Sequence, residues 1–225
     1  MPDLKKGFAT SGQKNKLIVF DLESFKVLKE VETGQNPDAL IYLPSIQEIA
    51  TSLEVKATIA LDGKPEAAVD HAEKGLVYVN LEDKSAVAAV DVRKHELAGT
   101  HSIAPGDAPT GLAADFKNGL LFAGRGNKKL VVVDFNSWKV VGSVEIGDHC
   151  DGAAFDPGTG NAYASCRDKS GGLHVKDEAT FEPLPALDTA GGKTCALDPK
   201  SHKLFITSGP ARGQSGTPKI LVFAP

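Results

Sequence analysis

Short apolar runs alternate with polar turns along the chain. In residues 75–93 the apolar run LVYVNL is followed by the polar turn EDKS and by a second apolar run that ends in aspartate, AVAAVD. The same order recurs in residues 119–137 and, near the beginning, in residues 7–24. Alternating runs of this length, separated by Gly, Asp, Asn and Lys, are typical of β-strands joined by hairpin turns. The pattern therefore predicts an all-β chain.

A Gly-X-X-Pro-like turn divides the chain into units. Proline or a substitute occupies its fourth position, in Pro37, Pro65, Pro109, Cys150 and Thr194. The intervals are 28, 44, 41 and 44 residues, and three of them match the period of about 40–45 residues that is typical of four-stranded propeller blades. A complete unit holds four predicted strands. We therefore predict a β-propeller of four-stranded antiparallel blades, rather than a β-sandwich, as a single domain over residues 1–225.

Aspartates recur at the end of the predicted third strand of a unit. They are Asp21, Asp91 and Asp134. A carboxylate at such a position accepts hydrogen bonds from backbone N–H groups two residues later and so begins a hairpin. Because catalytic acids on separate blades would lie far apart, the sequence favours Asx turns over catalysis at these positions.

The segments LVYVNLEDKSAVAAVD and FNSWKVVGSVEIG, with the turns GQNPD and APTG, resemble the YVTN-repeat β-propeller family, the surface-layer-like bacterial propellers. The resemblance extends over essentially all 225 residues. It implies a ring that usually has seven blades, a periplasmic or extracellular location and, for most members, no assigned activity.

The chain departs from this pattern in three places. The second unit is short by about 16 residues, and its two middle strands are missing near Ile49 and Ala50. The first unit begins at a second strand and the last one ends at a third strand, so that five or six repeats are visible. Two explanations remain open: a reduced ring, or a sequence that lacks an N-terminal segment and an internal piece. The absence of a signal peptide in MPDLKKGFATSG favours the second explanation.

Composition excludes several functional classes. A net charge of −4 and a pI near 5.9 disfavour a nucleic-acid partner, and the lack of a long apolar run disfavours a membrane span. The three cysteines form no CxxC, CxxCH or zinc-ligand spacing, so we interpret them as buried or half-buried side chains. The chain also lacks the GxSxG motif of a serine hydrolase.

The turns between units supply the candidate site, because in a propeller they converge at one mouth of the central channel. The position directly after the proline column holds Asp38, Glu66, Thr110, Asp151 and Cys195, and the position directly before it holds Asn36, Lys64, Ala108, His149 and Lys193. The predicted ligand-binding ring consists of Asp38, Glu66, Thr110, Asp151, His149, Lys64 and Lys193.

Three interpretations of this ring remain open. Asp38, Glu66 and Asp151 could hold a divalent cation through oxygen ligands, with His149 adding a ligand for a softer metal. The lysines could instead bind an anionic ligand. Finally, the acids could serve only as turn residues whose charge the lysines neutralise.

We therefore expect a non-catalytic binding or interaction scaffold. Its partner would be a protein or a small molecule at the channel mouth, and it would be a monomer without a cofactor. The alternative is a cation-dependent propeller enzyme, similar to a lyase or a lactonase, that uses the ring carboxylates; this alternative rests on analogy of fold alone. Without the family resemblance, the missing signal peptide would indicate the cytoplasm.

Overall fold

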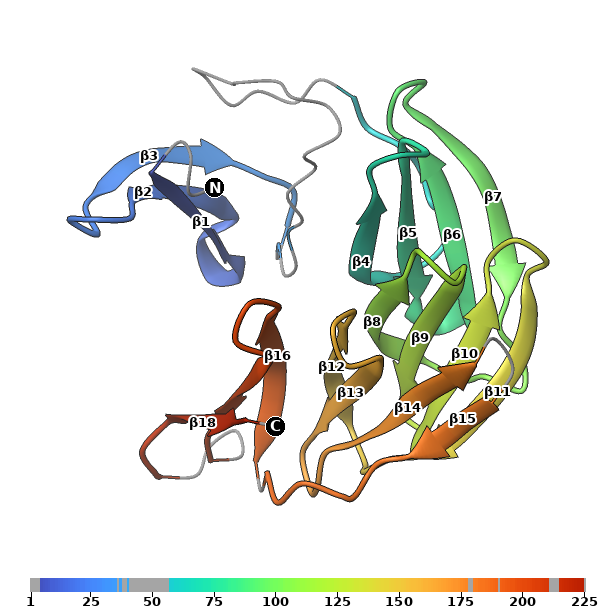
Figure 1. The fold of residues 1–225 in the computed structure, drawn as a ribbon. Coiled ribbons are helices and arrows are strands. Elements are labelled where there is room, and N and C mark those ends of the chain that lie inside the picture. The colour runs from blue at the N-terminus through green and yellow to red at the C-terminus, as the bar shows by residue number, and fades with distance from the viewer. Residues whose placement is uncertain are drawn as a thin grey trace.

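A computed structural model describes residues 5–35, 37, 40, 57–177, 180–189, 191–210 and 215–224. Within these ranges the strands form five antiparallel sheets, which follow one another in an arc around a common axis (Figure 1). Each sheet is a simple meander, because its strands pair in chain order. The prediction of an all-β propeller built from such sheets is confirmed.

The strand bounds show the repeat. The first sheet consists of β1 (Lys6–Ser11), β2 (Lys16–Asp21) and β3 (Val27–Glu32). The second consists of β4 (Pro65–His71), β5 (Leu76–Leu81), β6 (Ala86–Asp91) and β7 (Glu96–Ser102). The third consists of β8 (Pro109–Asp115), β9 (Leu120–Arg125), β10 (Lys129–Asp134) and β11 (Lys139–Glu145). The fourth consists of β12 (Cys150–Asp156), β13 (Asn161–Cys166), β14 (Gly171–Asp177) and β15 (Thr180–Pro183). The fifth consists of β16 (Gly192–Asp198), β17 (Lys203–Ser208) and β18 (Lys219–Phe223).

The first sheet begins at the counterpart of a second strand. A short 3-10 turn, η2 (Gly12–Lys14), joins β1 to β2, and the matching turn η4 (Glu82–Lys84) joins β5 to β6. Both turns end on a left-handed residue, Asn15 and Ser85. β16 pairs in the register of β4, so the fifth sheet contains counterparts of a first, second and third strand. This agrees with the predicted strand content of both units. The predicted deletion near Ile49 and Ala50 lies outside the described residues.

The recurring aspartates form the predicted Asx turns. Asp91 Oδ1 accepts hydrogen bonds from the N–H groups of Arg93 and Lys94, both at 2.9 Å. Asp21 and Asp134 accept equivalent bonds from the residues two and three positions later. The prediction of a structural role is therefore confirmed, because each carboxylate starts the hairpin to an outer strand.

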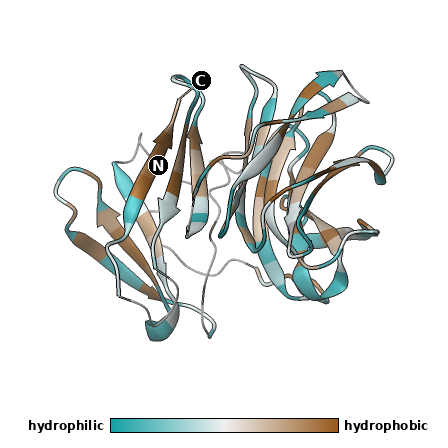
Figure 2. Ribbon diagram, turned by 90° about the horizontal axis from the view of Figure 1, so that it is seen from below, coloured by the Kyte–Doolittle hydropathy of each residue, from teal (hydrophilic) through white to brown (hydrophobic). Residues whose placement is uncertain are grey.

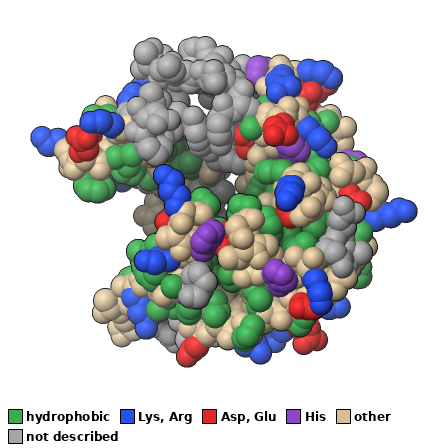
Figure 3. All heavy atoms as spheres, in the orientation of Figure 1, with side chains coloured by type: hydrophobic (Ala, Val, Ile, Leu, Met, Phe, Trp, Pro, Cys, Tyr) green, Lys and Arg blue, Asp and Glu red, His purple; other side chains and the backbone are tan. Residues whose placement is uncertain are grey.

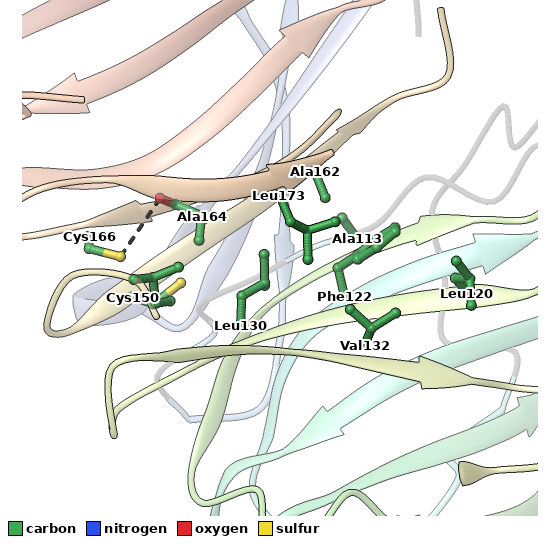
Figure 4. Packing of buried hydrophobic residues seen from close by; sticks show 11 residues of the cluster. Ala113, Leu120, Phe122, Leu130, Val132, Cys150, Ala162, Ala164, Cys166 and Leu173 are labelled. Atoms are coloured by element: carbon green, nitrogen blue, oxygen red, sulfur yellow. Dashed lines mark hydrogen bonds between the residues drawn. The ribbon is translucent and has the colours of Figure 1, made fainter. Parts of the chain in front are cut away.

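The apolar core lies between neighbouring sheets. One cluster joins the third sheet to the fourth and includes Phe122, Leu130 and Leu173 (Figure 4). Beside it, Phe122 stacks on Phe155 with ring centroids 5.3 Å apart. A second cluster joins the second sheet to the third. Because the middle sheets have a neighbour on each side, strands such as β10 bury successive residues on both faces. Figure 2 shows the resulting hydrophobic strands running through the body of the arc.

A buried carboxylate links the fourth sheet to the fifth. Asp156 at the end of β12 is fully buried, and His202 Nδ1 in the β16–β17 turn lies 3.0 Å from both of its carboxylate oxygens. Burial alone would raise the pKa of Asp156. Hydrogen bonds from Thr159, His202 and the Gly158 N–H outweigh this effect, so the pKa of Asp156 lies below its usual value.

We predict that Asp156→Asn destabilises the protein in a pH-dependent way. A carboxylate with a lowered folded-state pKa contributes stability above its unfolded pKa of 3.8, and this stability is lost as the pH falls through the folded pKa. Urea unfolding at pH 7 should show a free energy of unfolding about 1–3 kcal/mol lower than wild type. The difference should shrink below pH 3.8, while the exposed control Glu145→Gln changes little. An equal deficit at both ends of the pH range would contradict this account.

Candidate functional site

The inner strands bring four of the predicted ring residues to one register position. The strands β4, β8, β12 and β16 end opposite the first residue of the next strand, at His71, Asp115, Asp156 and Asp198. Each also has a register irregularity near its beginning. Counted back from the strand ends, the same position holds Glu66, Thr110, Asp151 and Lys193. We call these four residues the mouth ring.

The register of the fifth unit differs from the one predicted. Gly192, rather than Thr194, is the counterpart of Cys150, because Gly192 pairs with Ser208 as Cys150 pairs with Cys166. Lys193 therefore takes the ring position to which we had assigned Cys195, and Cys195 pairs with Ile206 further along the strand.

The backbone before the inner strands supports this correction. Ala108, His149 and Gly191 precede three successive inner strands, and their φ angles of 51°, 50° and 77° are all left-handed. Asn36 and Asp38 lie outside the described residues, so the predicted contribution of Asp38 to the ring stays a prediction.

Glu66 lies beside Lys64 rather than open to the channel. Lys64 Nζ is 2.8 Å from Glu66 Oε1 and also forms an ion pair with Glu82. The Lys64 N–H donates to Asp83 Oδ1 at 2.6 Å. The hydrogen bonds with Glu66 and Glu82 raise the pKa of Lys64, so its ammonium group is already committed to these acids.

Thr110 ties two inner strands together at the mouth. Its hydroxyl donates to the carbonyl oxygen of Cys150 on the neighbouring sheet. The strands approach so closely here that a Cβ on Gly111 would lie 2.7 Å from the carbonyl carbon of Gly152. On the other side, the Asn80 side-chain amide donates to the Gly111 carbonyl oxygen at 3.0 Å. Glycine and small polar groups thus hold the inner strands in place.

Asp151 has a cationic partner, and its neighbours form a separate group. Arg167 Nε lies 3.5 Å from Asp151 Oδ2. His149 Nδ1 lies 3.2 Å from Asp148 Oδ1, and Lys128 Nζ lies 3.8 Å from Asp148 Oδ2. His149 therefore faces Asp148, and nothing in the described contacts joins it to Asp151.

Lys193 differs from the other charged members of the ring. Its ammonium group is exposed, and it makes no ion pair with any residue that the structure describes. Lys193 on β16 is therefore the charged residue of the described mouth ring that has no oppositely charged side chain beside it.

An apolar groove of about 480 Å³ runs along the inner strands below the ring. It is lined by Ala68, Val69, Asp70, Ala72, Leu112, Ala113, Ala114, Phe116, Ala153, Ala154 and Phe155. Its uppermost residues, Ala68, Leu112 and Ala153, follow the ring residues of β4, β8 and β12 by two positions, a distance of about 7 Å along a strand. Figure 3 shows hydrophobic side chains between the polar groups on the face drawn there. A ligand could therefore meet polar groups at the ring and apolar ones below it.

The sequence analysis missed two polar residues near the mouth. Asn80 is fully buried, and its Oδ1 has no hydrogen-bond partner among the described residues. Its signal in the sequence was an amide within an otherwise apolar run, LVYVNL. Arg167 gave no such signal, because its partner Asp151 lies on the adjacent strand and is not its sequence neighbour.

The cysteines occupy the packed part of the structure, as predicted. Cys150 and Cys166 lie opposite each other on β12 and β13, and both are buried (Figure 4). Cys195 is partly buried, and burial raises the pKa of its thiol to about 12. At neutral pH this thiol stays protonated and is a poor nucleophile.

The described mouth does not present a ready cation site. No group of three or more His, Cys, Asp or Glu side chains in the described ranges is arranged to hold a metal ion. Glu66 and Asp151 instead face Lys64 and Arg167. The cation hypothesis stays a prediction, because one of its candidates, Asp38, is not described.

Comparison with known proteins identifies the fold alone. No family model and no curated protein matches the chain. Hydrazine synthase from Kuenenia stuttgartiensis is similar in structure with a TM-score of 0.59 and 13% identity, over 99% of this chain and 60% of that chain. A chain in the crystal structure of a mitotic checkpoint complex is similar with a TM-score of 0.70 and 11% identity, over 91% of this chain and 68% of that chain. Membership of the YVTN-repeat family therefore stays a prediction.

These comparisons agree with the observed architecture. The chain spans about 60% of the hydrazine synthase chain that it matches. Within the described residues, no helix is long and apolar enough to cross a membrane. The meandering sheets and the two structural neighbours together show a β-propeller fold.

We predict that the three thiols are protected in the native protein. At pH 8, Ellman's reagent should react slowly with the folded chain, because Cys150 and Cys166 are buried and burial raises the pKa of the partly buried Cys195. After denaturation in guanidinium chloride, all three cysteines should react within the mixing time. One thiol that reacts rapidly in the folded protein would contradict this prediction.

We also predict that divalent cations do not stabilise the described ring. Addition of Ca²⁺, Mg²⁺, Mn²⁺ or Zn²⁺ should leave the Tm unchanged, because Glu66 and Asp151 already have cationic partners. A rise in Tm that is lost in both Glu66→Gln and Asp151→Asn would instead establish a cation site at the mouth. A rise that survives both substitutions would place the cation elsewhere.

Proposed function

We propose that the protein is a non-catalytic β-propeller binding scaffold whose ligand lies across the mouth ring. The observation that carries this proposal is that Lys193 on β16 shares the register position of Glu66, Thr110 and Asp151, whose strands line the apolar groove. Lys64 and Arg167 are engaged by carboxylates, whereas Lys193 has no ion pair in the described part of the chain. The ligand class that fits both features is an anion with an apolar tail.

The chemistry of the groove supports this choice. Small side chains such as Ala68, Ala153 and Ala154 leave its volume open, and Phe116 presents a partly exposed ring at its lower end. Burial of an alkyl tail against such a surface is favourable by about 25 cal/mol per Å² of apolar area. The anionic head would then remain near the ammonium group of Lys193.

Octanoate and octanol form a matched pair of probes for this site. They share an alkyl tail and differ in the charge of the head, and their binding can be measured by saturation-transfer NMR. We predict that Lys193→Ala weakens octanoate binding about tenfold, which corresponds to about 1.4 kcal/mol, and leaves octanol unchanged. Ala153→Phe should abolish the binding of both probes by filling the groove.

Lys200→Ala serves as the control, because Lys200 lies in the turn after β16, at the opposite end of that strand from Lys193. Circular dichroism melts would show that each variant is folded. The proposal would be wrong if neither probe bound at concentrations up to about 10 mM. It would also be wrong if Ala153→Phe bound both probes as wild type does.

A further inference from the structure

The two buried cysteines form a directly opposed pair at the mouth end of the fourth sheet. Cys150 begins β12 and Cys166 ends β13, and their Cα atoms are partners in the antiparallel register. Side chains of directly opposed residues project from the same face of a sheet. Both side chains accordingly belong to the apolar cluster that joins the third sheet to the fourth, where each is at most 1% exposed (Figure 4).

The backbone hydrogen bonds show which kind of register pair this is. In a hydrogen-bonded pair the two residues exchange both of their N–H···O=C bonds, whereas in a non-hydrogen-bonded pair they do not, and their Cα atoms are only about 4.5 Å apart. The Cys166 N–H donates to Ser170 Oγ at 3.1 Å, and the Arg167 N–H donates to the Asp148 carbonyl oxygen at 3.0 Å. Cys150 and Cys166 are therefore a non-hydrogen-bonded pair, whose side chains lie closer together.

This separation suits a disulfide. A disulfide joins cysteines whose Cα atoms are about 4.4–6.8 Å apart and whose Cβ atoms are about 3.5–4.5 Å apart. Opposed residues on antiparallel strands have Cβ atoms about 4.5–5.5 Å apart, and non-hydrogen-bonded pairs are the closer ones. The register irregularity between Cys150 and Gly152 leaves Asp151 without a register partner. The small movement that a Cys150–Cys166 bond requires can therefore take place at this bulge, outside the regular ladder.

The two thiols already interact in the reduced protein. The Cys166 thiol donates a hydrogen bond to the Cys150 sulfur, and this bond lowers the pKa of Cys150 and raises the pKa of Cys166. Because the thiolate is the nucleophile in disulfide exchange, Cys150 is the attacking residue of the pair and Cys166 is the resolving residue. Cys195 lies on β16 opposite Ile206, and burial raises the pKa of its thiol to about 12.

We propose that Cys150 and Cys166 are a reversible modification site, at which a low-molecular-weight disulfide such as glutathione disulfide oxidises them to an intramolecular cross-strand disulfide. The Cys150 thiolate attacks one sulfur of glutathione disulfide, whose S–S bond breaks and whose leaving thiolate takes up a proton. Cys166 then loses its proton and attacks the Cys150 sulfur of this mixed disulfide, which releases the second glutathione. Two protein thiols are oxidised in this exchange, and one glutathione disulfide is reduced to two glutathione thiols.

Burial determines when this exchange takes place. Both thiols are covered in the folded chain, so the oxidant reaches them while the chain folds or when the end of β12 opens locally. Oxidation of the folded, reduced protein is therefore slow, in agreement with the slow reaction expected with Ellman's reagent. The equilibrium between dithiol and disulfide, by contrast, depends on the geometry of the folded state.

The disulfide would lie among the contacts that hold the mouth ring. Asp151 and Arg167, the sequence neighbours of the two cysteines, form an ion pair across the same two strands, and the Thr110 hydroxyl donates to the Cys150 carbonyl oxygen. A covalent link between β12 and β13 would fasten this part of the mouth in the oxidised protein. The oxidised chain is also expected to be the more stable form, because the link restricts the unfolded chain.

Refolding in glutathione redox buffers tests the proposal on the full chain. The reduced protein is refolded at a series of ratios of reduced to oxidised glutathione, trapped with acid, alkylated in denaturant and digested with trypsin. Cys150 and Cys166 fall in one tryptic peptide, residues 140–167, whereas Cys195 falls in residues 194–200. The Cys150–Cys166 disulfide therefore gives a single peptide that is lighter than its reduced form by two hydrogen atoms, and a disulfide of Cys195 gives two joined peptides.

The equilibrium constant for the Cys150–Cys166 disulfide should be at least about tenfold larger in the folded chain than in the same chain kept unfolded in guanidinium chloride. The oxidised protein should also have a higher Tm than the reduced protein. Cys195→Ser is the matched control and should keep both results, whereas Cys166→Ser should lose the rise in Tm on oxidation.

The proposal would be overturned if the equilibrium constant were no larger in the folded chain than in guanidinium chloride. A folded chain whose disulfide joined Cys195 to either of the other cysteines would overturn it as well. Both results come from the unsubstituted chain, so a variant that failed to fold could not produce them.

Discussion

Packing of one sheet on the next is the interaction on which the structure depends. A four-stranded sheet with apolar residues on both faces is stable only when both faces are covered, as in β10, where Leu130 to Val133 are all buried. Aromatic contacts such as Phe122 on Phe155 and Tyr78 on Phe135 join residues of different sheets. Among the described residues, the large apolar side chains with the highest exposure belong to the first and fifth sheets, at Phe25, Val27, Ile220 and Val222.

The same packing positions the inner strands and therefore the candidate site. Gly111 allows β8 to approach β12 closely, and the hydroxyl of Thr110 connects these two inner strands. The amide of Asn80 on β5 connects the second sheet to β8. The repeat supplies a uniform scaffold, and the residues that differ between repeats supply the chemistry. Glu66, Asp151 and Lys193 occupy one register position but have different charges and different partners.

The sequence was informative wherever structure depends on near neighbours along the chain. The Asx turns at Asp21, Asp91 and Asp134 were predictable because donor and acceptor are two or three residues apart. Strand order and the period of the sheets followed from the alternation of apolar and polar residues. The first and last units were also predicted correctly to lack a first and a fourth strand within the described residues.

The sequence did not predict those features of the site that depend on strand register or on a partner in another strand. The turn GGKTC was aligned with GDHCD by its glycine, but the left-handed residue of the fifth unit is Gly191, which moves Lys193 into the ring. Arg167 was missed because its partner lies on another strand. The exposure of Ile220 and Val222 was not predictable either, since their strand has the same pattern as buried strands and only the absence of a described neighbouring sheet distinguishes it.

Hydrogen exchange tests the central claim most directly, namely that covering both sides of a sheet stabilises it. The account predicts that amides of β9, β10 and β13 are strongly protected, because neighbouring sheets bury the side chains of these strands. It also predicts weaker protection of β3 and β18, whose side chains at Val27, Ile220 and Val222 are exposed. Equal protection of the middle strands and of β3 and β18 would contradict the account.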